Sequence, residues 1–542
     1  MVEDHGLLEH RNKIVLDNTN NIYNQNFQKF DSNLVSLNSF DDETFYNDDL
    51  SLNSNPVYLD SDTSSIGTSS SPEPLRSKKF DFNQILNDAD SDVYDISHLG
   101  SVASFISSRI NEGHEEGSFL VTNLSPIIGQ CEQWFQELPM VEPFYAMKCN
   151  PDPVTLRLLA SMGCGFDCAT KGEMEMVLNG LGKELSFGPR NIASTSIIYS
   201  HPAKMISHTE FALSNNIRMT VFDGEDELYK LASLPGHENF QLLMRIATDD
   251  KHSICRFSKK FGCNVREAPH LLEVARSLGL TVIGVSFHVG SGCGDGNAYV
   301  TALSHARWIF DVADEMNLPP MHMVDIGGGF PGDSGGYGGP GMPTFQDLAA
   351  SIRHGIALFA ESFPRSMDTV RFIAEPGRYF VSAATTIVTQ VYSRKGGNNP
   401  YQALYVDNGV YGSFNNVIYD HATPVPQKLS IVLESESMLK KNLSIVVKDH
   451  NALMLEEPEA HLLAPSNEDI NATMPVYESI PTAIFGPTCD GLDQMCSLES
   501  TLLPRCDIGD WLVWENQGAY THTASFVFNG FTHIPKRTYC IL

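Results

Sequence analysis

The stretch PFYAMKCN, residues 143–150, is apolar and β-prone up to a single lysine, Lys148, which stands beside a polar turn. A charged lysine at the end of a buried strand is unfavourable unless it is paired, neutral or used covalently. Taken alone, the stretch favours a strand-end lysine whose ammonium group reaches solvent. The alternative is a lysine that forms a Schiff base with an aldehyde cofactor. The rest of the chain distinguishes the two.

Seven further apolar runs follow this stretch, and helical patterns separate them. Eight strand–helix units in succession predict an α/β fold with a TIM-type (β/α)8 barrel rather than a doubly wound sheet. The predicted strands are Phe144–Cys149, Gly165–Cys168, Ile197–Ser200, Met219–Phe222, Leu242–Ile246, Val282–His288, Met323–Ile326 and Phe372–Glu375. Active sites of such barrels lie at the carboxyl ends of the strands. The residues predicted at that rim are Lys148, Asp167, Asp223, Arg245, His288, Gly327 and Glu375.

The chain outside the barrel differs in composition. Residues 1–85 are rich in Asn, Asp and Ser, which predicts a disordered acidic N-terminal tail. Residues 86–122 are expected to join a β domain, residues 123–382 to form the barrel, and residues 383–542 to form a C-terminal β-sheet domain. Residues from about 426 to 474 predict a mobile surface insertion, and the glycine-rich loop Gly332–Gly341 is expected to be flexible.

Charge and cysteine content exclude several classes of protein. The chain has 66 acidic and 36 basic residues, a net charge of −30, which argues against nucleic acid and anionic membranes as partners. We find no apolar run long enough to span a bilayer and no signal-peptide pattern, so we expect a cytoplasmic protein. The 11 cysteines form no CxxC pair, so neither a disulfide framework nor a metal site is expected.

Three strand ends have the elements of one cofactor site. Gly327–Gly329 follow a strand directly, and glycine lets backbone N–H groups approach a phosphate. Glu375 could hold a protonated ring nitrogen and Arg378 could assist the phosphate, although alone the two would indicate a surface ion pair. His288 could stack on a ring, although a lone histidine is more often a satisfied core residue. Together with Lys148, these residues predict a pyridoxal 5'-phosphate (PLP) site.

Ten segments resemble the motifs of one family. They are PFYAMKCN, GFDCATKGE, LLMRIATDD, GVSFHVGSGC, DIGGGFPG, AEPGRYF, NGVYGSFN, YDHA, FGPTCDGLD and ENQGAYT. These segments are similar to those of the eukaryotic ornithine decarboxylases, PLP enzymes of the alanine-racemase-like fold class. The resemblance covers roughly residue 90 to the end, apart from the predicted insertion.

The resemblance implies a role for each matched residue. Lys148 would hold PLP covalently, His288 would stack on its ring, and Cys489 would protonate the substrate Cα after CO2 leaves. From composition alone, Cys489 could equally be a buried structural thiol. The implied cofactor-binding residues are Lys148, Asp167, Glu173, Arg256, His288, Ser291, Gly328, Gly329, Glu375, Pro376, Gly377, Arg378 and Tyr520. The implied substrate-binding residues are Tyr419, Asp420 and Asp490. The carboxylates of the two aspartates suit the terminal ammonium group of a substrate.

The resemblance also implies an activity and an assembly. The reaction would be decarboxylation of L-ornithine to putrescine and CO2, the first step of polyamine biosynthesis. Cys489 and Asp490 would reach into the site of a partner subunit, so a homodimer with shared active sites is expected. The alternatives are a lysine decarboxylase of the same family and a non-catalytic paralogue that binds antizyme. Retention of Lys148, Glu375 and Cys489 argues against the non-catalytic alternative.

Overall fold

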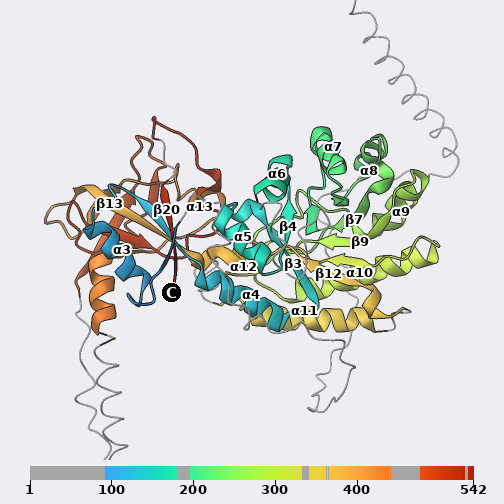
Figure 1. Ribbon diagram of the computed structural model, residues 1–542, viewed down its shortest axis with the longest axis horizontal. Coiled ribbons are helices and arrows are strands. Elements are labelled where there is room, and N and C mark those ends of the chain that lie inside the picture. Colours follow the sequence, from blue (N-terminus) through green and yellow to red (C-terminus); the bar gives the residue numbers. More distant parts are fainter. Residues whose placement is uncertain are drawn as a thin grey trace, which may run out of the picture. The chain divides into compact units, whose positions relative to one another are not determined.

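Eight parallel strands close into a barrel in the computed structural model of the chain (Figure 1). Each strand pairs with the next barrel strand along the chain, and β12 closes the ring against β3. The strands are β3 (Val141–Ala146), β4 (Gly165–Cys168), β5 (Ile197–Tyr199), β6 (Met219–Phe222), β7 (Gln241–Ile246), β9 (Val282–Phe287), β11 (Met323–Asp325) and β12 (Arg371–Ala374). All eight overlap predicted strands, so the predicted TIM-type barrel is confirmed.

The structure describes residues 92–180, 196–332, 341–361, 363, 365–438, 440, 477–531 and 535–542. The predicted N-terminal tail, residues 1–85, lies outside the described residues, as do residues 333–340 of the glycine-rich loop.

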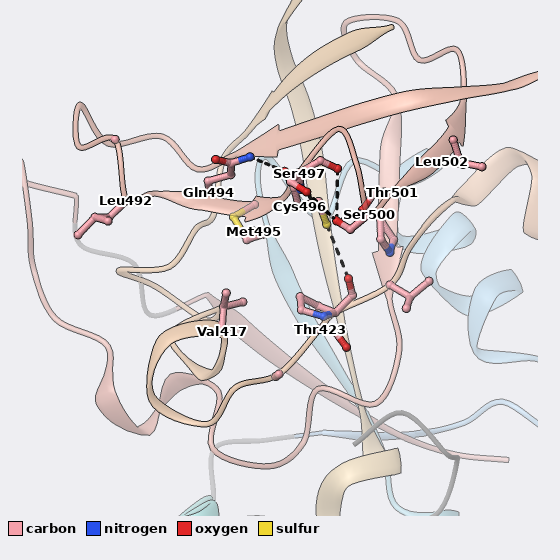
Figure 2. A pocket seen from close by; sticks show the side chains of 15 residues that line it. Val417, Thr423, Leu492, Gln494, Met495, Cys496, Ser497, Ser500, Thr501 and Leu502 are labelled. Atoms are coloured by element: carbon pink, nitrogen blue, oxygen red, sulfur yellow. Dashed lines mark hydrogen bonds between the residues drawn. The ribbon is translucent and has the colours of Figure 1, made fainter. Parts of the chain in front are cut away.

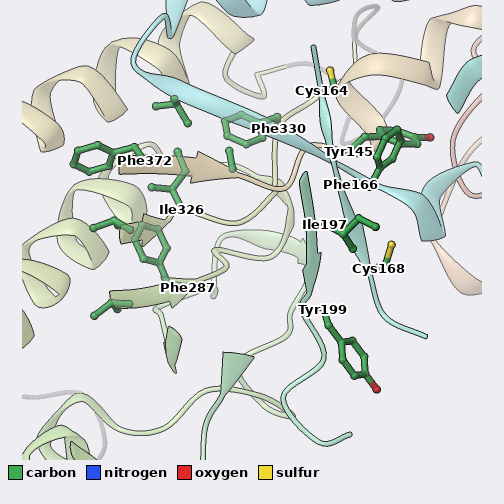
Figure 3. Packing of buried hydrophobic residues seen from close by; sticks show 14 of the residues in the cluster. Tyr145, Cys164, Phe166, Cys168, Ile197, Tyr199, Phe287, Ile326, Phe330 and Phe372 are labelled. Atoms are coloured by element: carbon green, nitrogen blue, oxygen red, sulfur yellow. The ribbon is translucent and has the colours of Figure 1, made fainter. Parts of the chain in front are cut away.

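Side chains alternate across the barrel wall. Phe144 and Ile198 belong to a cluster made only of barrel-strand residues. Their neighbours Tyr145 and Tyr199 belong to a larger cluster that also contains helix residues, part of which Figure 3 shows. This alternation is the two-residue period of a strand. Because both faces of the wall are apolar, the strands read as continuous apolar runs in the sequence.

Helices cover the outside of the barrel (Figure 1). They are α4 (Ser125–Glu137), α5 (Pro153–Ser161), α6 (Lys171–Gly180), α7 (Ile206–Ser214), α8 (Glu225–Ala232), α9 (Ala268–Ser277), α10 (Asn297–Glu315), α11 (Phe345–Ala360) and the short α12 (Arg378–Val381). Asp152 caps α5, because its carboxylate accepts the N–H of Thr155 at 2.9 Å. Among the described residues, no helix is long and apolar enough to cross a membrane.

A second domain combines segments from both ends of the described chain, drawn blue and red in Figure 1. Its ten-stranded sheet consists of β1 (Val93–Asp95), β2 (Phe119–Asn123), β13 (Thr385–Lys395), β14 (Gln402–Val406), β15 (Pro426–Lys428), β16 (Ser479–Phe485), β17 (Gln494–Cys496), β18 (Leu502–Pro504), β19 (Trp511–Trp514) and β20 (Lys536–Ile541). Strand β2 pairs with both β13 and β20. Helix α3 (Val102–Asn111) packs on this sheet through Phe105 and Ile106. The predicted β-sheet domain is therefore confirmed.

The first residues of the predicted insertion belong to this sheet domain. Strand β15 pairs antiparallel with β19, and a helix over residues 429–438 follows it. Leu429 is buried in the same cluster as Phe105, and Glu436 accepts a hydrogen bond from Ser101 at 2.6 Å. Residues 426–438, where the mobile surface insertion was predicted to begin, are therefore held against the sheet by apolar side chains. Residues 441–476 lie outside the described residues.

Candidate active site

Lys148 lies two residues beyond the end of its strand. Strand β3 ends at Ala146, and Met147–Cys149 form a single 3-10 turn. The predicted strand to Cys149 is thus too long. The strand stops because the N–H of Ala146 donates to the carbonyl of Pro376 at 3.1 Å and the carbonyl of Cys149 accepts from Tyr520 at 3.0 Å. The backbone of the turn therefore bonds with segments outside the β3–β4 ladder.

The ammonium group of Lys148 faces a buried carboxylate. Its Nζ lies 2.8 Å from Oδ2 of Asp167, whose side chain is fully buried, whereas 41% of the Lys148 side chain is exposed. The other carboxylate oxygen accepts a short hydrogen bond from Ser200. Burial lowers the pKa of Lys148, but the nearby Asp167, Tyr520 and Glu375 together outweigh this effect, so the net pKa is raised. The lysine is therefore charged and accessible in the chain alone.

Glu375 follows β12 directly and is buried. No described residue supplies a hydrogen-bond partner to its Oε1. Burial, together with the nearby charges of Asp167 and Asp325, raises its pKa well above the usual range of a carboxyl group. Burial likewise raises the pKa of Asp325 to about 6. A cationic group beside Oε1 would stabilise the ionised form of Glu375.

His288 and the glycine run lie against each other. The Nδ1 of His288 accepts the N–H of Gly290 at 3.0 Å, and its ring meets Phe257 edge-on at 4.9 Å. Burial lowers the pKa of His288 well below its ordinary value, so the ring is neutral. A Cβ on Gly328 would lie 2.9 Å from Nε2 of His288 and 2.7 Å from the carbonyl of Glu375. Only glycine lets the backbone come this close.

The predicted phosphate ligands also lie together. Nη2 of Arg378 is 3.5 Å from Oγ of Ser291, and its guanidinium lies 5.1 Å from the ring centre of Tyr520. The carbonyl of Gly329 accepts the N–H of Cys293 at 3.1 Å, which joins the glycine run to β10 (Ser291–Cys293). The rim thus brings a guanidinium, a hydroxyl and a glycine loop to one place, as a phosphate site requires.

Asp420, predicted to bind substrate, contacts this same arginine. Its Oδ2 accepts from Nη2 of Arg378 at 2.6 Å, and both side chains are buried. Tyr419, its neighbour, is 63% exposed. In this structure Asp420 therefore lies beside the predicted phosphate ligands.

Of four other predicted residues, three lie close to the Lys148 turn or to β4, and one does not. Glu173 accepts the N–H of Ala169 at 2.6 Å in the loop after β4, and burial raises its pKa. Pro376 and Gly377 lie against the Lys148 turn, since a Cβ on Gly377 would be 3.0 Å from Cβ of Cys149. Arg256 is exposed, and its Nη2 donates to the carbonyl of Lys251 at 2.7 Å. Unlike the others, Arg256 has its contacts outside the lysine cluster.

Cys489 is an exposed residue of the sheet domain, and Asp490 beside it is half-buried. The N–H of Cys489 donates to Oδ1 of Asn529 at 3.0 Å, and Tyr411 donates a short hydrogen bond to Asp490, which lowers the pKa of that carboxyl. Their partners are thus in their own domain, and the described chain does not bring them to Lys148.

A pocket of about 730 Å³ opens in the sheet domain beside these residues (Figure 2). Ala422 and Thr423, shortly after Asp420, form part of its lining, as do Gly491 and Leu492, directly after Asp490. No predicted site residue lines it. The pocket therefore borders the predicted substrate-binding residues but is separate from the lysine cluster.

Three residues of the cluster had no predicted role. Ser200 binds Asp167, Asp325 raises the pKa of Glu375, and Arg245 lowers the pKa values of both His288 and Glu375. Asp325 ends β11, Ser200 directly follows β5, and Arg245 is the last residue but one of β7; only Arg245 was placed on the rim from the sequence. Their position at strand ends is the signal that could have identified the other two.

Comparison with known proteins identifies the family. The model of the pyridoxal-dependent decarboxylase, pyridoxal binding domain, matches residues 124–382, which span the barrel. Ornithine decarboxylase of Mus musculus is 37% identical over 78% of this chain and 81% of its own length. The chain belongs to the eukaryotic ornithine decarboxylase family. Ornithine decarboxylase of Saccharomyces cerevisiae is 38% identical over 77% of this chain and 79% of its own length. Antizyme inhibitor 2 of Xenopus laevis is 37% identical over 79% of this chain and 82% of its own length.

Solved structures of the wider decarboxylase group share the fold of the family. Arginine decarboxylase of Paramecium bursaria Chlorella virus, bound to agmatine, has a TM-score of 0.64 at 29% identity and covers 81% of this chain and 100% of its own. Lysine/ornithine decarboxylase of Vibrio vulnificus, complexed with putrescine, has a TM-score of 0.62 at 26% identity. The match covers 83% of this chain and 99% of that one. The chain is a PLP-dependent decarboxylase.

The site fits this cofactor on its own geometry. Glu375 offers a buried carboxylate oxygen without a described partner, which suits a protonated pyridine nitrogen. Gly328 leaves open the space beside His288 that a Cβ would fill. Lys148 is exposed at the same rim as Arg378 and Ser291. These residues would hold the aldehyde, ring and phosphate of PLP.

Proposed function

We propose that the protein decarboxylates L-ornithine to putrescine and CO2, the first step of polyamine biosynthesis, in the cytoplasm. The observation that supports it most is buried Glu375, whose Oε1 lacks a described partner on the rim that presents Lys148. When bound in such a site, PLP would supply an electron sink for the negative charge left on Cα after the bond to the carboxylate breaks. Ornithine as the substrate rests on the named activity of the relatives from mouse and budding yeast.

The residues of the barrel prepare the site for this reaction. Asp167 holds the ammonium group of Lys148 near the carboxyl ends of β3 and β4. Glu375 would hold a proton on the ring nitrogen of the cofactor, and His288, which is neutral, would contact the ring without adding a competing charge. The phosphate would be held by Arg378, Ser291, Gly328 and Gly329, together with Tyr520 of the sheet domain. Because Glu375, His288 and Arg378 are buried, water weakens their electrostatic contacts less than it would at the surface.

The residues of the sheet domain complete the site across a homodimer. Cys489 gives its S–H proton to Cα after CO2 has left, and solvent then reprotonates the thiolate. Asp490 and Asp420 bind the distal ammonium group of the substrate. Cys489 is exposed, Asp490 is half-buried, and their hydrogen bonds to Asn529 and Tyr411 lie within the sheet domain, which supports their insertion into a partner subunit. Each of the two sites then uses residues from both chains.

Release of labelled CO2 from carboxyl-labelled ornithine, lysine and arginine, compared side by side, tests this function. We expect ornithine to be preferred over lysine by kcat/KM, by roughly 10–200-fold for one methylene. Lys148→Ala should abolish release, whereas Lys171→Ala, which removes a lysine paired with Glu175 on the barrel surface, should not. If the protein prefers lysine, the proposal that ornithine is its substrate is wrong.

A non-catalytic, antizyme-binding role is the second candidate, because Antizyme inhibitor 2 is among the relatives at the same identity. The same assay separates the two. Absence of CO2 from all three amino acids, in protein loaded with PLP, would favour this second role. Binding of purified antizyme would then be measured directly.

A further inference from the structure

The sheet domain holds the turn that presents Lys148. The N–H of Tyr520 donates to the carbonyl of Cys149 at 3.0 Å. The side-chain amide of Asn150 donates to the carbonyl of Gly518 at 2.8 Å, and both groups are buried. The two residues that follow Lys148 are therefore fixed by a segment more than 360 positions away in sequence.

A buried ionic cluster fixes the next part of the same segment. Oδ1 of Asp152 lies 3.1 Å from Nη1 of Arg537 and accepts the hydroxyl of Tyr539 at 2.6 Å. Its Oδ2 accepts from the backbone and hydroxyl of Thr155 and so caps α5. Arg537 and Tyr539 lie on β20, which pairs with β1 and β2 in the sheet domain. Only 10% of the Arg537 side chain and 5% of the Asp152 side chain are exposed.

Arg537 connects this cluster to the Tyr520 segment. Its Nη2 lies 3.0 and 3.1 Å from the two ring nitrogens of His522, two residues beyond Tyr520. Burial and the charge of Arg537 lower the pKa of His522 to about 4, so the ring is neutral beside the guanidinium. Contacts thus run in a closed circuit from Cys149 through Tyr520, His522 and Arg537 to Asp152.

We propose that Arg537 and Tyr539 are positioning residues for Lys148. They act through Asp152 on one side of the turn and through the Tyr520 segment on the other. The proposal rests on the proposed function, because it assigns the circuit to holding the lysine that binds the cofactor. A buried arginine and tyrosine between two domains could instead serve stability alone, and the test separates these roles. Misplacement of a reacting group by about 1 Å can cost 10²-fold in rate.

Three variants test the proposal in the PLP-loaded protein. Tyr539→Phe removes one hydroxyl, and Arg537→Met removes the guanidinium. The control is Arg394→Met, which breaks the ion pair of Arg394 with Asp507 at 2.8 Å in the same domain. For each we would measure thermal stability, the visible absorption band of bound PLP, the rate at which PLP exchanges with labelled PLP, and kcat and KM for ornithine.

We expect Tyr539→Phe and Arg537→Met to speed PLP exchange at least roughly tenfold, to shift the absorption band, and to lower kcat more than KM changes. Arg394→Met should change none of these, even if it lowers thermal stability. The proposal is overturned if the Tyr539 variant, folded and loaded, keeps the band and exchange rate of the unaltered protein. If the Arg537→Met variant does not fold, the PLP band and exchange rate of the Tyr539→Phe variant decide the proposal. PLP exchange needs no substrate, so it tests the circuit even if ornithine is not decarboxylated.

Discussion

Lys148 and Glu375 differ in their partners and in their exposure. Lys148 has a strong partner, Asp167, and an accessible side chain, which suits a group that must bind and release a ligand. Glu375 has no described partner for Oε1 and is surrounded by other carboxylates, so its charge is disfavoured until a cation arrives. A buried polar atom without a partner is unfavourable, and on the rim that presents Lys148 such an atom is suited to contact a cationic ligand group.

Glu375→Gln tests the charge of this side chain at constant shape. We expect kcat to fall by roughly 10²-fold or more, because an amide cannot hold a proton on the ring nitrogen by charge. KM should change by only a few-fold. The matched control is Glu142→Gln, which alters a carboxylate that binds Arg371 at the opposite end of the barrel strands. Steady-state kinetics of both variants decide, and an unchanged kcat for Glu375→Gln would contradict this role.

Most of the predicted residues could be found from the sequence because they end apolar runs. Asp167, His288 and Glu375 lie where they were expected. Arg256 is placed on the surface, since it stands in a long rim loop whose path no local pattern predicts. Asp325 was missed as a site residue although it directly precedes the glycine run. Its effect on Glu375 arises from two strands distant in sequence that meet in the barrel.

The glycine loop after β11 shows how backbone geometry shapes the rim. Gly327 has a positive φ of 66°, and a Cβ there would lie 2.2 Å from the carbonyl of Phe287. The loop must therefore cross directly over the end of β9. This crossing brings Gly328 beside His288 and Glu375.

Two variants, Gly327→Ala and Gly163→Ala, separate the effect of the clash between an added Cβ and the Phe287 carbonyl from the effect of backbone strain. Gly163 also has a positive φ, 92°, but a Cβ there would meet nothing within 4 Å. We expect Gly163→Ala to cost about 1–2 kcal/mol, the strain of a left-handed alanine, and Gly327→Ala to cost more. PLP affinity should fall only in the Gly327 variant. Urea unfolding and PLP titration measure both effects, and equal losses would show that close packing at Gly327 is unimportant.

The strands were predictable and the Lys148 turn was not, for one physical reason. Barrel strands are buried on both faces, so their local sequence is distinctive. The turn after β3 takes its hydrogen bonds from Tyr520 and Gly518 in the other domain. Such bonds leave no local pattern. The first predicted strand consequently ran three residues too far, to Cys149 rather than Ala146.

The whole chain divides the proposed chemistry between two domains. The barrel has the proposed cofactor residues except Tyr520, and the sheet domain has Tyr520, the exposed Cys489 and the half-buried Asp490. A homodimer with shared sites would bring the two sets together, which a single chain does not do in this structure. Two chains that are inactive for different reasons should then complement each other.

Mixing Lys148→Ala with Cys489→Ala subunits tests this assembly. Half of randomly exchanged dimers are mixed, and each mixed dimer has one intact site, so about a quarter of the normal putrescine output should return. Subunit exchange would be verified with differently tagged chains. If exchange occurs and putrescine formation does not recover, the two residues serve sites within one chain.

Mapping the lysine that holds PLP tests the central claim most directly. Borohydride reduction of the loaded protein fixes the cofactor to its lysine, and peptide mass spectrometry then locates the added mass. The competing residue is Lys204, which is buried and whose pKa burial lowers to about 8, a value that favours a reactive amine. Our account predicts the added mass on the peptide that contains Lys148 and its absence in Lys148→Ala. Added mass on Lys204, or on any other lysine with Lys148 unmodified, would contradict it.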